Sequence, residues 1–113
     1  MPYVHIKTTE EISEEMIEDL SVKFTDVIHE SFGVEKKWVM TLFTEKVPMR
    51  FDGKKDKLIH LDVRTMNDQT KENADKATKA FCEIIEKAFG VPGKNIYINY
   101  SITTYWGWND VNF

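Results

Sequence analysis

The sequence predicts an α+β fold in which two similar β-α-β units share one four-stranded sheet, with both helices on a single face. Three observations support this prediction: segments repeat at a constant spacing, two long segments carry apolar residues at helical spacing, and short apolar or alternating segments flank them. Two right-handed β-α-β units can merge into one sheet of this kind.

The repeat is clearest where each predicted helix ends, because Phe32-Gly33-Val34 matches Phe89-Gly90-Val91 57 positions later. The match continues through the flanking strands without a gap, so we expect a single domain over residues 1–113. The two repeats would cover residues 1–45 and 58–102, and a C-terminal tail would cover residues 103–113.

Each unit contains one predicted amphipathic helix, at about residues 13–32 and 69–89. Gly33 and Gly90 are typical of helix ends. The apolar stripe of the first helix consists of Met16, Ile17, Leu20, Phe24, Val27 and Ile28. That of the second consists of Ala74, Ala77, Phe81, Ile84, Ile85 and Ala88.

Alternation along the strands divides the sheet into two faces. The face toward the helices is predicted to carry Val4, Ile6, Val39, Phe43, Leu61, Val63, Ile96, Ile98 and Tyr100. The opposite face is predicted to carry Tyr3, His5, Trp38, Met40, Leu42, His60, Tyr97 and Asn99. The second face is too apolar to remain in water, so we expect an oligomer that buries it.

Composition excludes several classes of function. A net charge of −4 argues against nucleic acid as a partner, since phosphate contacts need clustered cations. A single cysteine, Cys82, excludes an internal disulfide and a CxxC site. The histidines lack metal-ligand spacing, and no leader or membrane-spanning segment is evident, so a cytoplasmic protein without metal or cofactor is expected.

The chain begins with Met1-Pro2 directly before the first predicted strand. Removal of Met1 would leave a rigid secondary amine, and an apolar site would lower its pKa from about 8, so that Pro2 could act as a base. The simpler interpretation is that proline is tolerated at the start of a strand, where no ladder donor is needed.

Pro2, the repeat, and the segments Tyr97-Ile98-Asn99-Tyr100 and Gly107-Trp108-Asn109 together resemble the tautomerase superfamily, most closely the branch of macrophage migration inhibitory factor. The resemblance covers nearly the whole chain. It implies a homotrimer whose sheets surround a central barrel, with active sites between neighbouring subunits.

The resemblance also implies site residues. Pro2 corresponds to the catalytic proline, and Tyr97 and Asn99 to pocket residues that reach in from the adjacent subunit. The apolar residues that floor the pocket correspond to Trp106, Trp108 and Phe113. Interface packing is the alternative role for these three aromatic side chains.

The resemblance implies two differences in charge from the family. Val34 stands where the family has a pocket lysine, and Arg64 stands where the family has an isoleucine at the end of the third strand. Arg64 could replace the lysine and bind a substrate carboxylate; the alternative is a surface arginine paired with Asp62 or Asp68. Lys36 and Lys37 are expected to lie in solvent.

The function predicted is that of an isomerase, a keto–enol tautomerase of a 2-oxo acid such as phenylpyruvate, with Pro2 as general base. Two alternatives remain. A protonated amine would suit a hydratase, dehalogenase or decarboxylase of the same superfamily, and a vestigial pocket would suit a cytokine-like binding protein.

Overall fold

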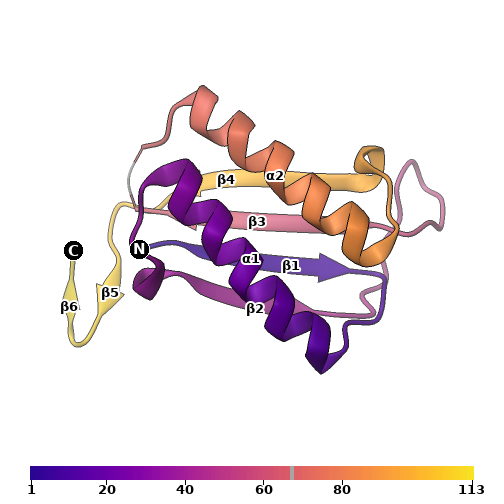
Figure 1. The fold of residues 1–113 in the computed structure, drawn as a ribbon, viewed down its shortest axis with the longest axis horizontal. Coiled ribbons are helices and arrows are strands. Elements are labelled where there is room, and N and C mark those ends of the chain that lie inside the picture. Colours follow the sequence, from indigo (N-terminus) through magenta and orange to yellow (C-terminus); the bar gives the residue numbers. More distant parts are fainter. Residues whose placement is uncertain (67) are drawn as a thin grey trace.

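The structure is a computed structural model that describes residues 1–66 and 68–113, and Figure 1 shows its order of elements. The first half contains β1 (Tyr3–Thr8), α1 (Glu14–Phe32), the 3₁₀ turn η1 (Lys36–Trp38) and β2 (Met40–Thr44). The second half contains β3 (Ile59–Thr65), α2 (Lys71–Phe89), η2 (Gly93–Asn95) and β4 (Ile96–Ile102), followed by the short strands β5 (Gly107–Trp108) and β6 (Val111–Asn112).

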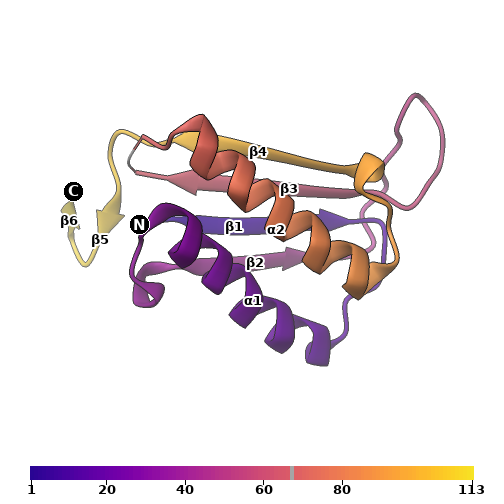
Figure 2. The ribbon, with the colours of Figure 1, turned by 45° about the horizontal axis from the view of Figure 1, so that its top comes forward.

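The main sheet has the strand order β2-β1-β3-β4. Within each half the two strands are parallel, whereas the central pair β1 and β3 is antiparallel, with Tyr3 opposite Arg64. Both helices lie across the same face of this sheet (Figures 1 and 2). The predicted arrangement of two helices on a four-stranded mixed sheet is therefore confirmed, while assembly into a barrel stays a prediction.

The two helices begin and end with the same local signals. Ser13 and Thr70 precede α1 and α2, and each hydroxyl accepts a hydrogen bond from the backbone N–H three residues further on. Gly33 and Gly90 end them with φ of 69° and 66°, a left-handed conformation that glycine adopts without steric cost. Among the residues described, neither helix is both long and apolar enough to cross a bilayer.

The core lies between the helices and the sheet. Phe24 of α1 and Phe81 of α2 are fully buried, and their rings meet edge to face with 5.4 Å between centroids. The predicted helix-facing residues are confirmed, since all of them are buried or pack partly buried against this cluster: Val4, Ile6, Val39, Phe43, Leu61, Val63, Ile96, Ile98 and Tyr100.

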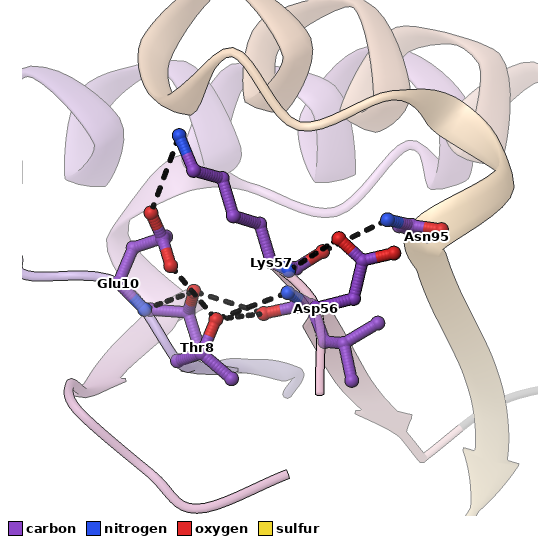
Figure 3. A network of polar contacts seen from close by, with 7 residues as sticks. Thr8, Glu10, Asp56, Lys57 and Asn95 are labelled. Atoms are coloured by element: carbon purple, nitrogen blue, oxygen red, sulfur yellow. Dashed lines mark hydrogen bonds and ion pairs between the residues drawn. The ribbon is translucent and has the colours of Figure 1, made fainter. Parts of the chain in front are cut away.

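A polar network holds together the sheet end at which β1 finishes and β3 and β4 begin (Figure 3). The Thr8 hydroxyl donates to the carbonyl of Leu58 at 3.0 Å, and the Leu58 N–H donates to the Thr9 hydroxyl at 3.0 Å. Asn95 donates its amide to the carbonyl of Lys57, also at 3.0 Å. These bonds fix the base of the connection between the two halves.

The open face of the sheet is more polar than the sequence predicts. Trp38 precedes β2 and is not part of the sheet, whereas Asp62 and Arg64 join this face because each lies opposite a β1 residue that points away from the helices. Asp62 is largely buried, and its carboxylate accepts a hydrogen bond from the Asn99 amide at 2.8 Å. The Asn99 carbonyl in turn contacts His60 Nε2 at 2.5 Å.

Tyr100 offers a test of the packing on the helix side. Its hydroxyl lies 2.8 Å from Thr78 Oγ1, and burial raises its pKa to about 12. The unfolded chain ionises this group near pH 10, so we expect the contribution of Tyr100 to the free energy of unfolding to be constant below about pH 10 and to fall from there to about pH 12. Denaturant titrations at pH 9 and 11 would measure the fall.

Tyr100→Phe should remove that part of the pH dependence, because the variant has no phenol to ionise. The matched control is Tyr105→Phe, since Tyr105 is 76% exposed. An equal fall in Tyr100→Phe and in the unmodified protein would contradict the packing described.

Candidate active site

The starts of β1 and β2 lie side by side because these strands are parallel, with Tyr3 opposite Met40. Pro2 is buried, and its carbonyl accepts a hydrogen bond from the Met40 N–H at 3.2 Å. The register brings the turn η1, which immediately precedes β2, to the same sheet end as Pro2.

The C-terminal tail returns to this end of the sheet. β4 ends at the same end of the sheet as the start of β1, with β3 between them, and the hairpin of β5 and β6 lies near the N-terminus in Figure 1. The two-residue turn of the hairpin is Asn109-Asp110, with φ of 49° and 68°. Such turns favour asparagine and aspartate, which tolerate the left-handed conformation.

Together these segments enclose a hollow of about 420 Å³ in front of Pro2. Its walls are mainly apolar and aromatic, which suits a flat apolar ligand. The lining consists of Met1, Pro2, Lys37, Trp38, Val39, Met40, Trp106 and Trp108.

Aromatic contacts fix the walls of the hollow. Trp38 and Trp108 meet at right angles with 5.0 Å between ring centroids, and Trp106 lies 6.3 Å from Tyr3. Phe113 supports the walls from behind: its ring lies 6.0 Å from Trp108, and its N–H donates to the Trp106 carbonyl at 2.9 Å. Phe113 is not among the residues that line the hollow.

The N-terminal amine lies at the same hollow, since Met1 is one of its lining residues. Partial burial lowers the pKa of this amine below its usual value near 8, because the charged form loses hydration. An amine at this position is therefore neutral over a wider pH range than an amine in water.

Arg64 lies on the open face of the sheet. Its Nε is 3.5 Å from a carboxylate oxygen of Asp62, and its guanidinium lies 5.9 Å from the centre of the Tyr3 ring. Tyr3 in turn contacts Trp106, so Arg64 reaches the walls of the hollow through one intervening ring. It does not itself line the hollow.

Tyr97 and Asn99 are not brought to Pro2 within one chain. Tyr97 lies opposite His60, and His60 opposite Lys7, four residues beyond Tyr3. This places Tyr97 about 13 Å from Tyr3 along the strand direction. Tyr97 instead contacts Phe51, with 5.0 Å between ring centroids, and lines a separate hollow of about 280 Å³.

Comparison with known families decides the identity of the fold. Residues 1–109 match the family described as macrophage migration inhibitory factor (MIF). This chain belongs to the MIF family. No curated protein gives a significant match.

Solved structures of MIF proteins from other organisms are similar over nearly their whole length. MIF2 of Leishmania major is 26% identical with a TM-score of 0.94, covering 100% of this chain and 97% of that one. The MIF homologue of Prochlorococcus marinus is 24% identical with a TM-score of 0.90, covering 98% of both chains. The MIF-like protein of Entamoeba histolytica is 24% identical with a TM-score of 0.89, covering 99% of this chain and 98% of that one.

Val34, for which the resemblance implies the position of the family's pocket lysine, packs against the core and does not line the hollow. The sequence did not predict Lys37 and Trp38 as site residues, but both line the hollow in front of Pro2. The signal was available: residues that precede the second strand of a parallel pair lie beside residues that precede the first.

Proposed function

We propose that this protein is a homotrimeric keto–enol tautomerase of 2-oxo acids such as phenylpyruvate, in which Pro2 acts as general base once Met1 has been removed. The observation that carries the proposal is the aromatic hollow in front of Pro2, where burial lowers the pKa of an amine. Membership of the MIF family supports it.

In the proposed reaction the Pro2 nitrogen takes a proton from C3 of the substrate, next to the carbonyl carbon. The electron pair of the C–H bond forms the C2–C3 double bond, and negative charge develops on the carbonyl oxygen. Return of the proton to that oxygen gives the enol. The step needs a neutral amine at the start and hydrogen-bond donors near the oxygen.

We assign the donors to Tyr97 and Asn99 of the adjacent subunit, since these residues lie too far from Pro2 of their own chain. Exposed apolar side chains support assembly, because they gather on β2, β4 and the tail: Met40, Tyr97, Ile102, Tyr105, Trp108, Val111 and Phe113. β2 and β4 are also the edges of the sheet and can pair with other strands.

A cation near the start of β1 would hold the substrate carboxylate. Arg64 is the candidate from the sequence, since the end of β3 lies beside the start of β1, and Lys37 is a second candidate because it lines the hollow. Both would act by charge-assisted hydrogen bonds to the carboxylate oxygens.

The pH dependence of turnover tests the role of the amine, after intact mass spectrometry has established that Met1 is absent. Pro2 is buried, and burial of a free amine there would lower its pKa as it does for the Met1 amine, so we expect kcat/KM for phenylpyruvate to rise with pH and to level off below pH 8. Activity that falls as the amine loses its proton would contradict a general base. It would favour the hydratase, dehalogenase or decarboxylase alternative, in which the charged amine is an acid.

A further inference from the structure

The hollow in front of Pro2 combines aromatic walls with positive charge. Among the described residues that line it, Lys37 carries the only charged side chain. Trp38, Trp106 and Trp108 supply flat apolar surface on the walls. A hollow of this composition matches an aromatic ring joined to an anionic group.

The turn η1 separates the two neighbouring lysines. In a 3₁₀ turn successive side chains point about 120° apart. Lys36 forms an ion pair with Asp26 of α1 at 2.9 Å, and this partner raises the lysine pKa. Lys37 instead lies over the ring of Trp38, with its Nζ 5.2 Å from the ring centroid. Only the second lysine therefore belongs to the hollow.

The Lys37 ammonium is available to a ligand. Its ion-pair partner is Glu35 at 3.3 Å, and the side chains of the two residues are 65% and 71% exposed. Exposed pairs of this kind contribute little to stability, so a ligand carboxylate can take the place of Glu35 at little cost. The contact with Trp38 keeps the charge at the wall of the hollow.

Arg64 is less available. Its partner Asp62 has a side chain only 11% exposed, so withdrawal of the guanidinium would leave a largely buried carboxylate with less compensating charge. Arg64 also lies over the Tyr3 ring, outside the set of residues that line the hollow.

We infer that Lys37 is the carboxylate-binding residue of this site, and that it makes the hollow selective for aromatic acids over uncharged aromatic compounds of the same shape. The inference rests on the proposed function only for the identity of the substrate. Lys37, and not Arg64, is then the cation that determines specificity for the carboxylate.

Binding of two unreactive probes of matched shape tests the inference without turnover. 3-Phenylpropionate carries the carboxylate, and 3-phenylpropanamide replaces it with a neutral amide. Quenching of tryptophan fluorescence or calorimetry would give the Kd of each probe. We expect Lys37→Gln to raise the Kd of the acid about tenfold and to leave that of the amide unchanged.

Lys36→Gln is the matched control and should change neither Kd, because Lys36 faces Asp26. Unchanged acid affinity in Lys37→Gln, or a loss of acid affinity confined to Arg64→Gln, would overturn the inference. An unmodified protein that binds both probes equally would overturn it too. A protein that prefers the acid through Lys37 but does not turn over phenylpyruvate would contradict the proposed function and leave the inference standing.

Discussion

Pro2→Ala should lower kcat/KM for phenylpyruvate by at least about 100-fold, since positioned proton transfer contributes roughly 10²–10⁴ in rate. Alanine offers a primary amine on a freely rotating residue, whereas the proline ring fixes φ and holds its nitrogen in one direction. Retention of Met1 should have an equal or larger effect, because it turns the Pro2 nitrogen into an amide without basicity. An assay of enol formation with each protein would measure both losses.

The fold should survive this substitution. Pro2 takes part in the local hydrogen bonding through its carbonyl, which accepts from the Met40 N–H, and alanine keeps that carbonyl. Circular dichroism and sedimentation should therefore be unchanged. Labelling by 3-bromopropiolate gives an independent measurement: trimmed protein should be modified at Pro2, and protein that retains Met1 should not. Turnover that is undiminished in Pro2→Ala would exclude Pro2 as the base, and unlabelled Pro2 would favour a binding role.

Val111→Asp should convert the assembled protein into monomers and abolish turnover with it. Val111 lies on β6 and is 54% exposed, beside the exposed rings of Trp108 and Phe113. A carboxylate at this position would have to be desolvated without a partner in an apolar contact between chains. Sedimentation at micromolar concentration should change from about 40 kDa, three times the 13.3 kDa of the chain, to the mass of one chain.

Two controls separate assembly from local damage. Val111→Thr keeps the shape and β-branching of valine without a charge and should stay trimeric. Val22→Asp introduces the same charge at another exposed valine, 63% exposed on α1 and outside the tail, and should also stay trimeric. An active trimer in Val111→Asp would show that the tail does not carry the contact.

The fold was predictable because its signals are local and occur twice. The glycines that end the two helices stand 57 positions apart, and the helices follow the same displacement, beginning at Glu14 and Lys71. Alternation along short strands then divided core residues such as Val4 and Val63 from the open face. None of these signals needs knowledge of contacts between distant parts of the chain.

The site was less predictable because it depends on register. That Lys37 lies at the hollow follows from the pairing of Tyr3 with Met40, which spans more than thirty residues. The carboxylate of Asp62 meets the Asn99 amide because the register of β3 and β4 places these two residues opposite each other. Sequence spacing alone does not reveal that Arg64 lies over Tyr3.

The C-terminal hairpin has one further consequence. Trp108 faces the hollow, while its neighbours Val111 and Phe113 on the same small hairpin present apolar surface to the outside. A molecule that binds against Trp108 would contact the same segment that we expect another subunit to contact. Occupancy and association then become thermodynamically linked, so that each strengthens the other by the same factor. Low ligand and low protein concentrations would then weaken the proposed activity together.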